Sequence, residues 1–100
     1  MATKVKIGKR KYKIRKANLP KNIYGTTSGH EITIRSGLRG RLEAKTKLHE
    51  ILHGCVNEYA KEEHEIHVEE DIVYAIEKGV SEFAKHNPEE WIMLAVILMR

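Results

Sequence analysis

The chain has 100 residues, of which 41% are hydrophobic and 32% are charged, and its formal net charge is +4. This length suits one domain, spanning residues 1–100, and the composition is ordinary for a soluble globular protein. The one cysteine, Cys55, excludes an internal disulfide and a zinc finger built from cysteines. The longest apolar run, residues 91–99, is about half of what a membrane span needs, and no apolar signal core follows Met1. We therefore expect a soluble, cytoplasmic protein with no membrane partner.

Charge is distributed unevenly along the chain. Residues 1–50 hold 14 of the 18 lysines and arginines but three of the 14 acids, so their net charge is +11, against −7 for residues 51–100. A basic half of this kind is able to bind nucleic acid or an acidic protein partner. Lysines also protect exposed strands from aggregation, and no nucleic-acid-binding motif accompanies the charge. Both interpretations stay open at this stage.

The first third of the chain has the pattern of short strands. Charged and apolar residues alternate over residues 4–7 and 12–15, with a hairpin turn predicted at residues 8–10. Two further strands are predicted at residues 23–25 and 31–35, joined by a turn at residues 26–29. We expect an antiparallel sheet of three to four short strands. If strand 31–35 forms its edge, that strand could bind an extended peptide by strand addition.

The period changes after Ser36-Gly37, where a long helical pattern begins. Its apolar residues recur at three-and-four spacing at Leu48, Ile51, Leu52, Cys55, Val56 and Tyr59. A charged loop is predicted over residues 61–67, followed by a helix with an apolar side formed by Ile72, Val73, Ile76, Val80, Phe83 and Ala84. Asn87 and Pro88 end that helix, and a third helix covers residues 89–98. Strands followed by three helices indicate the α+β class.

The long helix contains the sequence His49-Glu50-Ile51-Leu52-His53. Histidines four residues apart lie on the same face of a helix, where their imidazoles can share one tetrahedral Zn²⁺. Glu50 is rotated away from that axis but can reach a water on the metal, take its proton and pass it to a leaving amine. This spacing is therefore typical of peptide hydrolysis with a zinc-bound water, with Glu50 as the general base.

The third metal ligand distinguishes the classes of zinc peptidase. A histidine six residues after His53 would indicate the metzincin pattern, but Tyr59 occupies that position. The acidic segment at the start of the next helix offers carboxylates instead. Glu70 continues the predicted buried stripe of Val73 and Ile76, with Glu69 and His67 as rivals, although acids are also favourable at any helix start. Tyr59, Tyr74, His64 and His67 are weaker candidates for stabilising an oxyanion, since packing or surface roles explain them as well.

These segments resemble a known family. Leu48-His49-Glu50-Ile51-Leu52-His53, then Glu70-Asp71-Ile72-Val73, then Gly79 and Asn87-Pro88-Glu89 are similar to the small phage-encoded zinc metallopeptidase-like proteins of the SprT-like or ImmA/IrrE-like gluzincin type. The resemblance implies a minimal zincin-like domain, a zinc site of His49, His53 and Glu70, and a host cytoplasmic location. Two departures are Gly54, where a better helix former is expected, and Tyr74-Ala75, where relatives tend to carry charges.

Two functions follow from the sequence. The first is a zinc-dependent peptidase acting on a protein or peptide substrate. The alternative is a non-catalytic zinc-binding protein that binds nucleic acid or a protein partner through its basic half. The C-terminal helix is apolar nearly all round, which fits closure of the core or a homodimer contact.

Overall fold

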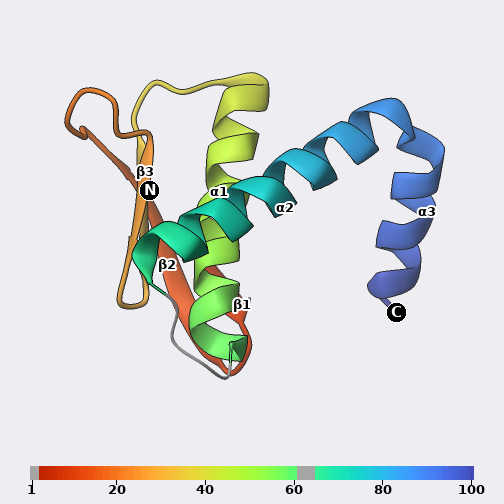
Figure 1. Cartoon of the computed structure of the whole chain (residues 1–100), viewed down its shortest axis with the longest axis horizontal. Coiled ribbons are helices and arrows are strands. Elements are labelled where there is room, and N and C mark those ends of the chain that lie inside the picture. The colour runs from red at the N-terminus through yellow and green to blue at the C-terminus, as the bar shows by residue number, and fades with distance from the viewer. Residues whose placement is uncertain (1–2, 61–64) are drawn as a thin grey trace.

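A computed structural model describes residues 3–60 and 65–100 of the chain. Four strands are followed by three helices, which confirms the α+β class (Figure 1). The elements are β1 (Thr3–Ile7), β2 (Arg10–Ala17), β3 (Gly25–Ser28), β4 (Glu31–Arg35), α1 (Gly40–Tyr59), α2 (Ile66–His86) and α3 (Pro88–Leu98). None of the described helices combines the length and the apolar character that crossing a membrane requires.

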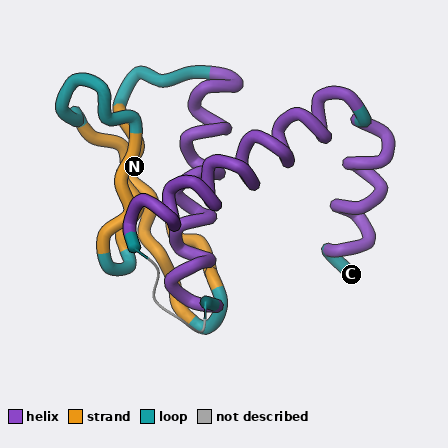
Figure 2. The backbone as a smooth tube through the Cα atoms, in the orientation of Figure 1, coloured by secondary structure: helices purple, strands orange, loops and turns teal. Residues whose placement is uncertain are grey.

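The sheet is mixed, so the expectation of an antiparallel sheet was wrong for its central pair. The strand order is β1-β2-β4-β3, and β2 pairs with β4 in parallel, whereas the outer pairs are antiparallel. Parallel neighbours need a long connection. Here residues 18–30 supply it, carrying the chain to the far edge as β3 and then back into the sheet as β4 (Figure 2). The edge strand beside the helices is therefore β3 and not the strand at residues 31–35.

The turn between β3 and β4 is shorter than the sequence suggested. Residues 26–28 were predicted as a turn but belong to β3, and the reversal takes place at Gly29 and His30. Gly29 has a φ of 59°, which favours glycine. The predicted hairpin turn between β1 and β2 is confirmed at Gly8 and Lys9, and Gly8 likewise has a positive φ of 63°.

The apolar core lies between the sheet and α1. It consists of the fully or nearly buried Ile7, Tyr12, Ile14, Ile32 and Ile34, with Ile51 and Cys55 of α1 packed against them. The Tyr12 hydroxyl donates a hydrogen bond of 2.7 Å to Glu58 Oε2 at the end of α1. Burial, together with this carboxylate, raises the pKa of Tyr12 to about 12, so the phenol stays protonated near neutral pH.

Gly54 permits the close contact between α1 and the sheet. A methyl group at this position would lie 2.7 Å from Ile7 Cδ1 and 3.4 Å from the Tyr12 ring. Real side-chain carbons do not approach this closely, so even alanine would force the core to move. Close packing against the sheet therefore explains a glycine at a position where a better helix former was expected.

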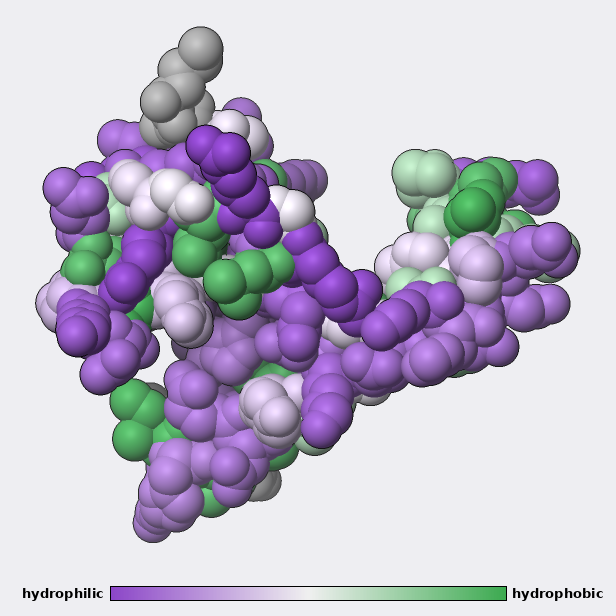
Figure 3. Space-filling model, turned by 90° about the horizontal axis from the view of Figure 1, so that it is seen from above, coloured by the Kyte–Doolittle hydropathy of each residue, from purple (hydrophilic) through white to green (hydrophobic). Residues whose placement is uncertain are grey.

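The second half of α2 and all of α3 form an arm that stands away from the sheet (Figures 1 and 3). The predicted apolar side of α2 is largely exposed, because the face that turns inwards carries Val73, Glu77 and Ser81. No residue of α3 is buried, so this helix does not close the core. Its apolar side chains are exposed at the tip of the arm, and a homodimer through α3 stays a prediction.

Candidate metal centre

The face of α1 that turns towards β3 and α2 is polar. Thr46, Glu50 and His53 are buried on it, and the His49 side chain is 20% exposed. Positions four and seven residues apart fall on one face of a helix, so both histidines of the sequence motif point the same way. This polar face is enclosed because α2 crosses α1 there and β3 lies alongside (Figure 1).

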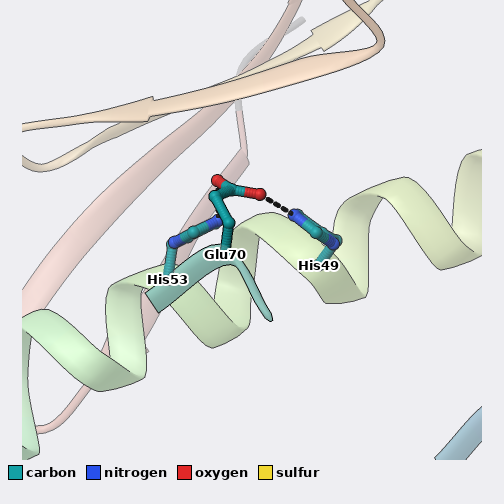
Figure 4. Close-up of side chains that lie close together, drawn as sticks. All are labelled: His49, His53 and Glu70. Carbon is teal, nitrogen blue, oxygen red and sulfur yellow. Dashed lines mark ion pairs between the residues drawn. The ribbon is translucent and has the colours of Figure 1, made fainter. Parts of the chain in front are cut away.

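The first turns of α2 bring carboxylates over the two histidines. Glu70 lies between the imidazoles, with Oε1 2.7 Å from His53 Nε2 and Oε2 3.4 Å from His49 Nε2 (Figure 4). Its neighbour Glu69 lies on the other side of His53, with Oε2 2.6 Å from Nδ1. The adjacent acids therefore face different nitrogens of the same ring.

His49, His53 and Glu70 form a group that could hold a metal ion, since one donor atom of each lies within 4.8 Å of the others. Tetrahedral zinc has ligand bonds of about 2.1 Å and so separates its ligands by about 3.4 Å. A small movement of these side chains reaches that spacing. Two imidazole nitrogens and one carboxylate oxygen are also the donor set of many catalytic zinc sites, in which a fourth position binds water or substrate. The residues present fit zinc.

Glu50 lies beside this group and is 6% exposed. Thr27 of β3 donates a hydrogen bond of 2.8 Å to Glu50 Oε1 and contacts the Glu50 carbonyl oxygen at 3.1 Å. Gly25 permits this approach of β3, since a methyl group there would lie 3.0 Å from Glu50 Cγ. The carboxylate is thus held in place through one oxygen by the edge strand.

Two hollows meet at the motif. One, of about 330 Å³, is lined by Gly25, Thr26, Thr27, Asn57, Ile66, Glu69 and Glu70 together with the two histidines and Glu50. The other, of about 380 Å³, extends from His49 and Glu50 towards Ile23, Tyr24, Leu42, Lys45 and Glu77. Arg35 supports the second hollow by donating to the Ile23 and Pro20 carbonyl oxygens. Together they make a cleft along β3 with Glu50 at its middle.

Those weaker sequence candidates that lie within the described residues do not line this cleft. Tyr59 and Tyr74 are 68% and 55% exposed on α1 and α2, and His67 is exposed beside Glu65. His64 lies outside the described residues, as does most of the predicted loop at residues 61–67, of which Ile66 and His67 belong to α2. Cys55 packs against the apolar core and so lies apart from the metal group. Burial raises the pKa of its thiol.

Three residues of the site were not singled out from the sequence. Gly25 and Thr27 were assigned to the last position of a strand and to a turn, so their approach to Glu50 was not expected. Glu77 had a usable signal, because it lies seven residues, or about two helical turns, after Glu70 and shares its face. Glu77 also lies four residues after Val73, on the same face of the helix. An acid on the face of a buried valine indicates a polar site and not a solvated surface.

Comparison of the chain with protein-family models, curated proteins and solved structures finds no match in any of the three. The family resemblance therefore stays a prediction, and the function is argued from the site itself.

Proposed function

We propose that the protein is a zinc-dependent peptidase. The observation that carries this proposal is the convergence of His49, His53 and Glu70 on one point beside the buried carboxylate of Glu50. A site that only stores metal has no need of a general base next to an open cleft. In the proposed assignment the first three residues bind zinc and Glu50 transfers the proton.

Zinc in this site would acidify a bound water and polarise the carbonyl of the scissile peptide bond. The Glu50 carboxylate accepts one proton of the attacking water while the water oxygen bonds to the carbonyl carbon. The same carboxyl group then gives that proton to the leaving nitrogen as the carbon–nitrogen bond breaks. The products are a carboxylic acid and an amine, which exchange a proton to give a carboxylate and an ammonium group. Thr27 holds Oε1 of Glu50 throughout, so the other oxygen is available for the proton.

The edge strand supports a peptide as the substrate class. β3 pairs with β4 on one side, and within the described residues no strand pairs with its other side. An extended peptide can add to such an edge through main-chain hydrogen bonds. Because Gly25 and Thr27 also contact Glu50, a peptide bound there would run past the carboxylate with its side chains over the two hollows.

The proposal is tested by removing and restoring the metal. Protein stripped with a chelator should not cleave an unfolded, fluorescently quenched casein substrate. Addition of about one equivalent of Zn²⁺ should restore cleavage, whereas Mg²⁺ should not, because it prefers oxygen ligands over imidazole. Cleavage that survives the chelator, or a zinc-loaded protein that cleaves neither casein nor a broad peptide library, would contradict the proposal.

A second function is favoured by the sheet surface that faces away from α1. Lys4 lies directly across from Lys13, and Lys6 from Lys11, and all four side chains are exposed. Like charges at directly opposite positions destabilise a sheet. Glu31 of β4 lies across from Lys13, but no ion pair joins any of the four lysines to a described residue. A surface that accepts this repulsion is suited to bind the phosphates of nucleic acid.

This second function predicts salt-dependent binding of a 20-base-pair DNA duplex by fluorescence anisotropy. The logarithm of the binding constant should fall linearly with the logarithm of salt concentration, by about 0.9 per phosphate contact. Replacement of the four lysines with glutamine should remove the binding, while Lys78→Gln and Lys85→Gln on α2 should leave it intact. Equal binding by both sets of variants would rule out this surface.

A further inference from the structure

Glu77 is a buried carboxylate with one oxygen that has no hydrogen-bond partner among the described residues. The residue is 8% exposed and lies on the inner face of α2, against α1. Among the described residues, its Oε2 is the buried side-chain polar atom that has no hydrogen-bond partner. A carboxylate oxygen removed from water without a partner destabilises the folded state. Such a group is usually retained for function.

The titratable side chain that faces Glu77 is His49. Glu77 Oε1 lies 3.9 Å from Nδ1 of His49, while Nε2 of the same ring faces Glu70 at 3.4 Å. His53 has the same arrangement, because its Nδ1 faces Glu69 at 2.6 Å and its Nε2 faces Glu70 at 2.7 Å. Each imidazole therefore turns one nitrogen to the shared carboxylate and the other to a carboxylate of its own.

Histidines that bind metals commonly donate the proton of their second nitrogen to a carboxylate. That hydrogen bond fixes the tautomer and the orientation of the ring, and it makes the ligating nitrogen a better donor to the metal. The contact between Glu69 and His53 is already of hydrogen-bond length. A movement of about 1 Å would bring Glu77 and His49 into the same range.

We propose that Glu77 is a positioning residue for His49, accepting the Nδ1 proton so that Nε2 is presented to the metal. Glu69 does the same for His53. The proposal rests on the metal-binding half of the proposed function and does not depend on peptide cleavage. It explains why a carboxylate with one unpartnered oxygen is buried between α1 and α2.

The test compares zinc affinity with the stability of the metal-free protein. Glu77→Met keeps the length of the side chain and removes the acceptor, and Glu82→Met makes the same change at a half-exposed position of α2. Competition with a zinc-binding dye should show about 10- to 100-fold weaker zinc binding by Glu77→Met. Its metal-free form should be at least as stable to urea as the wild type, because a buried carboxylate oxygen without a hydrogen-bond partner is gone. Glu82→Met should bind zinc normally.

A second readout reports the tautomer directly. In the zinc-loaded wild type, a long-range ¹H–¹⁵N spectrum should show His49 with its proton on Nδ1 and the metal on Nε2. The proposal is overturned if His49 binds through Nδ1, or if Glu77→Met binds zinc as tightly as the wild type. A higher KM with unchanged zinc affinity also overturns it, because Glu77 would then contact substrate from the second hollow.

The outcomes separate this inference from the proposed function. Normal zinc binding by wild type and Glu77→Met removes the inference and leaves the metal site intact. Weaker binding by Glu77→Met in a protein that cleaves no peptide supports the inference and contradicts the peptidase. A wild type that binds no zinc contradicts both.

Discussion

Replacing Glu50 with glutamine is expected to reduce peptide cleavage by about 100- to 10,000-fold while leaving zinc bound, since general-base catalysis typically contributes that much. Glutamine has the same shape, and its amide oxygen can still accept the hydrogen bond from Thr27. It cannot accept and return a proton. The proposed metal ligands are other residues, so zinc content should not change. The measurement is kcat for a quenched-fluorescence peptide, alongside metal analysis of the same sample.

A matched control for this variant is Glu43→Gln in the first turn of α1. Glu43 pairs with Lys16 at 3.3 Å and lies outside the cleft, so its replacement should leave kcat unchanged. If Glu50→Gln retains full activity with zinc bound, Glu50 is not the base. If it loses zinc as well as activity, the residue contributes to the metal site and the assignment of roles is wrong.

Substitution of Glu69 and of Glu70 with glutamine should affect zinc affinity differently. The two substitutions are chemically identical and lie at adjacent positions of α2. Glu70→Gln should weaken zinc binding by more than about 100-fold, because an anionic ligand is lost. Glu69→Gln should weaken it by about 10- to 100-fold, as is typical for a group that orients a ligand. The reason is the geometry, in which Glu70 faces both Nε2 atoms and Glu69 faces His53 Nδ1.

Competition titrations against a zinc-binding dye measure both variants on one scale. Each variant therefore serves as the control of the other for charge and for position on the helix. The reverse order of affinities would make Glu69 the ligand. Equal and small losses in both would mean that neither carboxylate binds the metal.

Local patterns of the sequence were sufficient for much of the fold. Alternation gave β1 and β2, the three-and-four spacing gave α1, and Asn87-Pro88 marked the boundary between α2 and α3. The parallel pairing of β2 with β4 was not predictable in this way. It depends on how far residues 18–24 carry the chain, and no period or turn residue encodes that distance. The orientation of α2 was missed because its apolar side is exposed and its inner face is polar.

The candidate site also has a part that the sequence predicts and a part that depends on tertiary packing. His49, Glu50 and His53 are close in sequence, so helix geometry alone places them together. Glu70 comes from another helix, and the choice between it and Glu69 depends on how α2 is rotated where it crosses α1. Gly25, Thr27 and Glu77 reach the site only through tertiary packing. The sequence therefore identifies the three motif residues on α1 better than it identifies the residues that pack around them.

The central claim is that His49, His53 and Glu70 hold zinc with one position left open beside Glu50. A crystal of the zinc-loaded protein, measured at the zinc absorption edge, tests it most directly. We expect one anomalous peak per chain, which marks a zinc ion. That ion should be bonded to Nε2 of both histidines, to a Glu70 oxygen and to a water within hydrogen-bond reach of Glu50. The absence of a peak there, or an ion whose fourth position is filled by a protein side chain, would contradict the account.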